Sequence, residues 1–305
     1  MKGKSRKKVA AAKGSGKSRG GGGLGNGPIT DVNQLSVVSS SVAAQIKTAC
    51  GIFSGKRSVA PSQVMMPELV TKPGTERWPV KTGQDPDRNA VGKNVIDGKN
   101  LGAGIVSTTV EELISMPRPP GLEVLTADPP AFQNKRAQPV ETTIWQLDVT
   151  ITVVNQEADG DNHLVIQGAS GATMVAEVPT PTTTFIGDSP WMANIKDARQ
   201  AVDDKLIHTL SPQDFVLVPG NTKLVPKDSL SGDFPTPPLT NFKMPESFLT
   251  PLEGAEGPTM PTFQAAVKPT KARITGVGFF DRAHGATGAA PNVIEIHPVL
   301  KIVWL

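Results

Sequence analysis

The stretch Thr142–Val154, TTIWQLDVTITVV, decides the fold class of this chain. Apolar and polar residues alternate along it, which predicts a β-strand with one buried face and one face in water. The predicted buried face consists of Trp145, Leu147, Val149, Ile151 and Val153, and the predicted wet face of Gln146, Asp148, Thr150 and Thr152. The chain is therefore expected to be mainly β.

The residues after this strand predict the rest of a barrel. HLVIQGA and ATMVAEV read as two strands joined by the tight turn Ser170–Gly171. SPWMANIKDARQAVDDKL then predicts a helix, with Ser189 as N-cap and Pro190 at its first position. The last two predicted strands are ARITGVGFFD and VIEIHPVLKIVWL, and Gly276 and Gly278 indicate a bend or a bulge in the first of them. The order β-β-β-α-β-β is that of a five-stranded OB-like barrel.

Composition divides the chain into three predicted parts. Residues 140–305 are expected to form the OB-like barrel domain, with a long insertion at about 207–270, before the fourth strand, that is rich in Pro and Gly and could contact a protein partner. Residues 31–139 are expected to be an extended, Pro/Gly-rich segment with short helices, anchored by Trp78. Residues 1–30 are expected to be a disordered basic arm rich in Gly and Ser.

Charge is distributed unevenly between the two ends of the chain. Residues 1–139 hold 20 Lys/Arg and 10 Asp/Glu, which gives a net charge of +10. Residues 140–305 hold 11 Lys/Arg and 18 Asp/Glu, which gives a net charge of −7. A flexible cationic arm binds polyanions such as nucleic acid through counterion release, without reading sequence; a solubilising terminus is the alternative. The predicted contact residues of the arm are Lys2, Lys4, Arg6, Lys7, Lys8, Lys13, Lys17 and Arg19.

Several classes of protein are disfavoured by what the sequence lacks. No apolar run approaches the roughly 18 residues that a membrane-spanning helix needs. The single cysteine, Cys50, excludes an intramolecular disulfide. The apolar stretch LSVVSSSVAAQIKTAC is diluted by serines and interrupted by Lys47, so no conventional signal peptide is predicted and a cytoplasmic location is favoured.

Polar residues near the strand ends form the candidate chemical site. If the last two strands pair as a hairpin, His284 comes within reach of Glu295 or His297. Two imidazoles and a carboxylate can hold a divalent metal that activates water for hydrolysis, for instance of a phosphodiester. A structural polar network is the competing interpretation, because no HExxH or GxSxG motif is present. The full candidate metal set is His284, Glu295, His297, Asp281, His163 and Asp161.

Parts of the chain also resemble a known family. The similar stretches of the core are TIWQLDVTITVVNQEADGDNHLVIQGASGATMVAEVP, SPWMANIKDAR and RITGVGFFDRAHGATGAAPNVIEIHPVLKI, and those before it are ERWPVKTGQDPD and STTVEELISMPRP. They resemble a family of small, largely uncharacterised bacterial proteins with one OB-like β-rich domain. Members are often exported, which makes export the alternative location. The resemblance covers about half of the chain, leaves out the arm and residues 207–270, and implies no activity.

These observations favour a non-enzymatic binding or structural module whose arm associates with nucleic acid or another polyanion. No catalytic residues are assigned. One alternative is a metal-dependent hydrolase, such as a nuclease, with a His/Glu/Asp site at the end of the barrel. Another is a particle-forming coat subunit, since a cationic arm before a β-barrel is a common means of packaging nucleic acid; this alternative requires an oligomer.

Overall fold

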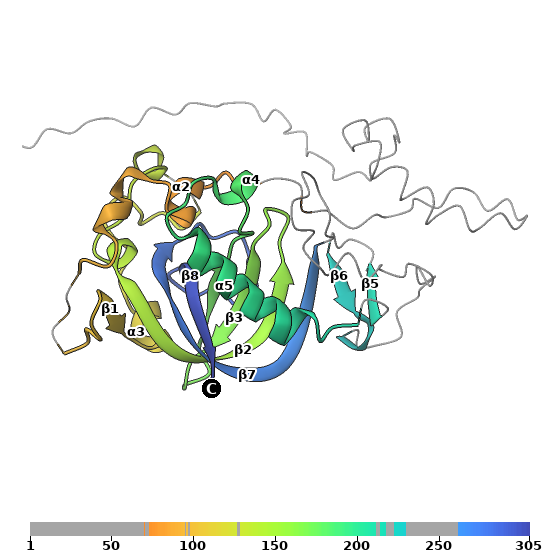
Figure 1. Ribbon diagram of the computed structural model, residues 1–305. Helices are drawn as coiled ribbons and strands as arrows, with labels where there is room; N and C mark the ends of the chain where they lie inside the picture. The colour runs from red at the N-terminus through yellow and green to blue at the C-terminus, as the bar shows by residue number, and fades with distance from the viewer. Residues whose placement is uncertain are drawn as a thin grey trace, which may run out of the picture. The chain divides into compact units, whose positions relative to one another are not determined.

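The computed structural model describes residues 70, 73–94, 96, 98–126, 129–211, 214–217, 223–229 and 262–305. The protein is mainly β, with strands joined in the order β1-β2-β3-β4-β8-β7-β6-β5 (Figure 1). Because β2 also pairs with β7, the strands from β2 to β7 in this order close a ring. The predicted arm and much of the predicted insertion lie outside the described residues.

The elements follow one another along the chain as short helices and strands of very unequal length. The helices are α2 (Trp78–Thr82), α3 (Val110–Ile114), α4 (Thr183–Ile186) and α5 (Met192–Val202), the last continuing into a π-helical turn (Asp203–Ile207). The strands are β1 (Ile105–Ser107), β2 (Ile144–Gln156), β3 (Asn162–Gln167), β4 (Thr173–Val178), β5 (Phe215–Leu217), β6 (Leu224–Pro226), β7 (Phe263–Phe280) and β8 (Ile294–Trp304). Short 3-10 turns lie at Pro86–Ala90, Pro130–Phe132, Val140–Thr142 and Lys227–Ser229. None of the described helices is long and apolar enough to span a bilayer.

The ring consists of four antiparallel pairs, which are β2–β3, β3–β4, β7–β8 and β2–β7, and one short parallel pair, β4–β8. β7 and β8 pair antiparallel, as the sequence predicts for the last two strands. β3 and β4 form the predicted hairpin. β4 and β8 pair parallel through only Val175 with Glu295 and Ala176 with Ile296. The short β4–β8 pair therefore closes the ring.

Strand β2 carries the predicted alternation, with one correction at Val153. Trp145 and Ile151 are buried in the core, but the register shifts between Ile151 and Val153. An inserted residue reverses which side chains face inward beyond it. Val154 therefore lies in the core at 0% exposure, and Val153, predicted to be buried, is only partly so.

Strand β7 begins at Phe263 rather than at the predicted Ala272, so the insertion expected at about 207–270 ends earlier. Phe263 is fully buried and stacks edge-on against Phe215, with ring centroids 5.7 Å apart. Pro269 concealed this part of the strand in the sequence, because proline cannot donate to a neighbouring strand. The pairing with β2 jumps from Ala266 to Thr270, so Pro269 lies in a bulge.

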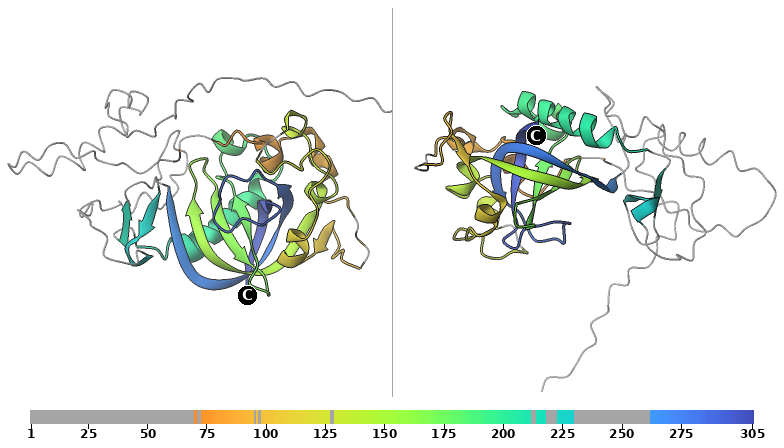
Figure 2. Two further views of the ribbon diagram at one scale, coloured as in Figure 1. Left: turned by 180° about the vertical axis from the view of Figure 1, so that it is seen from behind. Right: turned by 90° about the horizontal axis from the view of Figure 1, so that it is seen from below.

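Helix α5 packs its apolar face against the ring, as predicted. Ile195, Ala198 and Val202 are buried in the same core cluster as the inward side chains of the strands. The helix lies against β8 and β4 (Figure 2). It begins at Met192, two residues after the predicted Pro190, and the Ser189 hydroxyl accepts a hydrogen bond from the Trp191 N–H at 3.2 Å.

Gly276 is predicted to tolerate no side chain, because β8 crosses it closely. The register between β7 and β8 shifts on both sides of Gly276, which confirms the expected bulge. A Cβ at this position would lie 2.4 Å from Ile296 Cγ2 and 2.6 Å from the Pro298 carbonyl oxygen. We expect Gly276→Ala to lower the free energy of unfolding by about 1–3 kcal/mol in urea titrations, since overpacking forces the backbone to move.

Lys271→Ala is the control for this substitution. Lys271 lies on the same strand and is exposed. Surface substitutions of this kind change stability by less than about 0.5 kcal/mol. Equal stabilities of the two variants would show that β7 and β8 do not approach so closely at the bulge.

Candidate functional site

Most of the predicted site residues lie on the outer face of the ring, where β3, β4 and β8 meet. His163 on β3 pairs directly with Glu177 on β4. Glu295 on β8 is the register partner of Val175 on β4, two residues before Glu177. Because strand side chains alternate, His297 shares the outer face with Glu295, whereas Ile296 faces the core.

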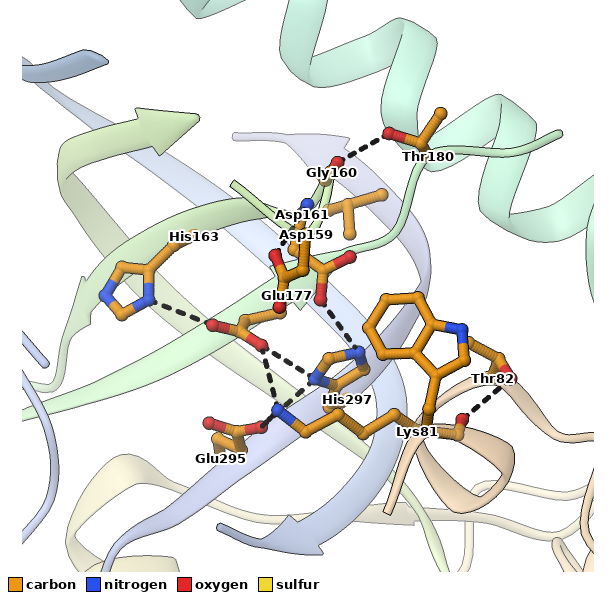
Figure 3. Close-up of polar contacts among 12 residues, drawn as sticks. Lys81, Thr82, Asp159, Gly160, Asp161, His163, Glu177, Thr180, Glu295 and His297 are labelled. Atoms are coloured by element: carbon orange, nitrogen blue, oxygen red, sulfur yellow. Dashed lines mark hydrogen bonds and ion pairs between the residues drawn. The ribbon is translucent and has the colours of Figure 1, made fainter. Parts of the chain in front are cut away.

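This outer face is covered by helix α2 rather than by water. Trp78, the predicted anchor, is 7% exposed, and its indole N–H donates to the Phe185 carbonyl at 2.6 Å. Its ring meets the His297 imidazole edge-on at a centroid distance of 6.4 Å. Glu295 and His297 are consequently buried, at 4% and 0% exposure. We call Lys81, Asp161, His163, Glu177, Glu295 and His297 the outer-face cluster (Figure 3).

His297 is the centre of the cluster. Its Nδ1 lies 2.8 Å from Glu177 Oε2 and 3.1 Å from Glu295 Oε1. Its Nε2 points the opposite way, 3.4 Å from Asp161 Oδ2. The imidazole thus lies between carboxylates on both sides, as the dashed lines in Figure 3 show.

Lys81 supplies a positive charge on the Nδ1 side of His297. Its Nζ lies 3.6 Å from Asp281 Oδ1, 3.7 Å from Glu177 Oε2 and 3.8 Å from Glu295 Oε1. Burial disfavours the ammonium, but the carboxylates of Asp281, Glu295 and Glu177 outweigh burial and raise the pKa of Lys81 well above its ordinary value. Lys81 is therefore charged at neutral pH.

The carboxylates of the cluster differ in how readily they ionise. Burial opposes the charge of Glu177, but Lys81 and hydrogen bonds from His163 and His297 hold its pKa well below the ordinary value. Burial, with Glu177 and Asp281 nearby, raises the pKa of Glu295 well above the ordinary value. Glu177 is thus the fixed anion of the cluster, while Glu295 more readily holds a proton.

His163 is held in place from both ring nitrogens. Its Nδ1 lies 3.0 Å from Glu177 Oε1, and its Nε2 lies 2.9 Å from the Thr287 carbonyl oxygen. Burial lowers the pKa of His163, but the interaction with Glu177 exceeds that effect and raises it. His163 therefore ties the loop after β7 to the β3–β4 hairpin.

His284 lies at the edge of the cluster and not in it. Its side chain is 48% exposed, and its Nε2 lies 3.2 Å from Asp281 Oδ2. This hydrogen bond raises the pKa of His284 against the effect of burial. Burial opposes the charge of Asp281, but Lys81 and then His284 lower the pKa of Asp281. Asp281 is the link, because Lys81 contacts its other oxygen.

Two members of the cluster were missed by sequence reasoning. Glu177 is the single charged residue in the strand TMVAEV, and only its pairing opposite His163 reveals its role. Lys81 lies far from the barrel in sequence, in WPVKT, next to the predicted anchor Trp78. An isolated acid on a strand and a lysine beside an anchoring aromatic are the signals that could have identified them.

A cavity of about 230 Å³ lies beside the cluster, in the loop between β7 and β8. Its walls are mostly apolar, including Leu125 and Val175, and its charged or titratable groups are Asp281, Arg282, His284 and Glu295. Comparison with family models, curated proteins and solved structures finds no match for this chain. What the protein does must therefore be inferred from its own residues.

Proposed function

We propose that this chain is a non-enzymatic binding or structural module, an OB-type barrel whose basic arm associates with nucleic acid or another polyanion. The observation that carries the proposal is the charge distribution. The first nineteen residues hold eight Lys/Arg and no acid, whereas residues 140–305 carry a net charge of −7. Polyanions are attracted to the first part and repelled by the second.

The OB-type assignment is supported by the order of elements around the ring. β2, β3 and β4 precede α5, and β7 and β8 follow it. β7 joins β2 to β8, and β8 returns to β4. This matches the β-β-β-α-β-β order expected from the sequence, with β1, β5 and β6 added outside the ring.

The burial of the outer-face cluster favours binding over catalysis. A catalytic metal needs a coordination position open to water and substrate. Among the predicted ligands, His297 and Asp161 are 0% exposed, and Glu295 is 4% exposed. His284, which is half-exposed, contacts Asp281 at the edge of the cluster. A hydrolase centred on His284, Glu295 and His297 is therefore disfavoured.

The surface of the barrel offers little for base recognition. The chain contains no tyrosine, and the wet face of β2 carries Gln146, Asp148 and Thr150. Asp148 forms an exposed ion pair with Arg273 on β7. OB barrels that bind single strands use aromatic platforms in a basic groove. Contact with nucleic acid is therefore assigned to the arm, without sequence preference.

Deleting residues 2–19 is expected to abolish most of this binding. Each phosphate contact contributes about 0.7–0.9 to the slope of log affinity against log salt, so loss of the eight Lys/Arg lowers the slope by about 6 if all eight contact phosphates. The affinity for a labelled oligonucleotide at low salt falls more than about tenfold. Fluorescence anisotropy over a series of salt concentrations measures both quantities.

The control removes two positive charges elsewhere, in Lys268→Gln/Lys271→Gln. Both lysines are exposed on β7. This variant should keep nearly the full salt dependence. An unchanged slope in the deletion variant would exclude the arm as the contact. Retention on heparin, compared with DNA and RNA, shows whether nucleic acid is preferred over other polyanions.

A further inference from the structure

The side of His297 that faces away from Lys81 contains buried polar atoms that make no hydrogen bond, although Nε2 and Asp161 Oδ2 lie 3.4 Å apart. Both carboxylate oxygens of Asp161 and the Nε2 atom of His297 have no hydrogen-bond partner among the residues that the structure describes. Both residues are 0% exposed. A buried polar group left unpaired is costly, so each such group calls for an explanation, for example an ion.

We propose that Asp161, Glu177 and His297 hold a divalent metal ion, with zinc as the best fit. One potential ligand atom from each side chain lies within 4.8 Å of the others. The 3.4 Å between His297 Nε2 and Asp161 Oδ2 is the spacing of two ligands on a tetrahedral ion, since bonds of about 2.0–2.1 Å at the tetrahedral angle place ligands about 3.3–3.4 Å apart.

The surroundings of His297 prepare its Nε2 atom for coordination. When a carboxylate accepts the proton of one ring nitrogen, the other nitrogen presents its lone pair to a metal. Glu177 Oε2 and Glu295 Oε1 lie 2.8 and 3.1 Å from Nδ1, so a carboxylate accepts the proton on that side. His163 holds Glu177 Oε1 at 3.0 Å, and Glu177 Oε2 lies on the Nδ1 side of His297, so Oε2 would move toward Asp161 to bind the ion. An imidazole and two carboxylates suit zinc, whereas calcium and magnesium favour all-oxygen sites.

Local charge also favours a cation at this place. Asp159 lies beside Asp161, and the Asp161 N–H donates to Asp159 Oδ1 at 3.3 Å. Lys81 makes its ion pairs with Glu177, Asp281 and Glu295 and not with these two aspartates. Buried like charges are tolerated when a cation or a proton compensates them.

The position of the site indicates a structural role, beyond the proposed binding function. Asp161 precedes β3, Glu177 lies on β4 and His297 lies on β8. β4 and β8 share only two register pairs where the ring closes. An ion held by all three side chains would join the strands at this weak point. Since all three are buried, the ion would be closed to substrate, as structural zinc sites are.

The test uses the full chain without a histidine tag, expressed with added zinc and dialysed against metal-free buffer. Mass spectrometry of the metal content is expected to find about one zinc per chain. After chelation with EDTA, added Zn²⁺ is expected to raise the melting temperature by several degrees, because an ion that binds only the folded state stabilises it. Asp161→Asn and His297→Gln should lose both the bound zinc and the shift.

His284→Gln and His208→Gln are the control variants, because both side chains are partly exposed and lie outside the proposed ligand set. Both should keep the metal. Wild-type protein with neither bound metal nor a Zn²⁺-dependent shift would overturn the proposal, whatever the variants do. So would metal retained in both Asp161→Asn and His297→Gln. Deletion of residues 2–19 should leave the metal content unchanged, which separates this proposal from that of the arm.

Discussion

Replacing Arg77 by methionine is expected to lower the free energy of unfolding by about 3–5 kcal/mol, because it leaves a buried carboxylate without its counter-charge. Arg77 donates to both oxygens of Glu141, at 2.8 and 2.7 Å, and both side chains are 0% exposed. The guanidinium also donates to the carbonyl oxygens of Phe132, Lys135 and Phe280. Three carbonyl oxygens, in the 132–135 loop and at the end of β7, therefore lose a hydrogen-bond donor at once.

Arg273→Met is the matched control, because it breaks an ion pair of the same chemistry in water. Arg273 and Asp148 are 45% and 53% exposed in their side chains. Exposed pairs contribute about 0–1 kcal/mol. Urea unfolding of both variants measures the contrast. Similar losses in the two variants would contradict the placement of Arg77 and Glu141 in the interior.

The Arg77–Glu141 pair matters for the site because Arg77 immediately precedes α2. The pair fixes the start of the helix that brings Trp78 and Lys81 over β8. A second buried pair, Arg136 with Asp85 at 2.6 Å, holds the chain after α2. Residues outside the barrel thus determine how the outer-face cluster is covered.

The features predicted correctly from the sequence are those that depend on local patterns. Alternation located β2, and the Ser170–Gly171 turn located the β3–β4 hairpin. Each of these signals spans a few residues, so it can be interpreted without knowledge of the tertiary structure.

The features that sequence reasoning missed depend on contacts between distant residues. Val153 was assigned to the core because a bulge leaves alternation in the sequence unchanged. The first part of β7 was missed because Pro269 is tolerated only in a bulge opposite β2. Lys81 joins the candidate site only through the docking of α2, which rests on the Arg77–Glu141 pair, 64 residues apart in sequence.

Trp78→Ala is expected to destabilise the protein by about 3–5 kcal/mol, the usual cost of truncating a buried aromatic side chain. Trp78 is 7% exposed, belongs to the main core cluster and donates its indole N–H to the Phe185 carbonyl. Figure 1 shows α2 beside α4, the helix that ends at Ile186. Loss of the ring removes both the packing and this link.

Trp78→Phe separates these two contributions. Phenylalanine keeps an aromatic ring near His297 but loses the hydrogen bond, which contributes about 0.5–1.5 kcal/mol. Chemical denaturation of both variants gives the stabilities. The alanine variant should also expose His297, now 0% accessible, to modification by diethyl pyrocarbonate, with Trp78→Phe as the protected control. If His297 stays unreactive in Trp78→Ala, then the strands alone, and not α2, keep water from the outer-face cluster.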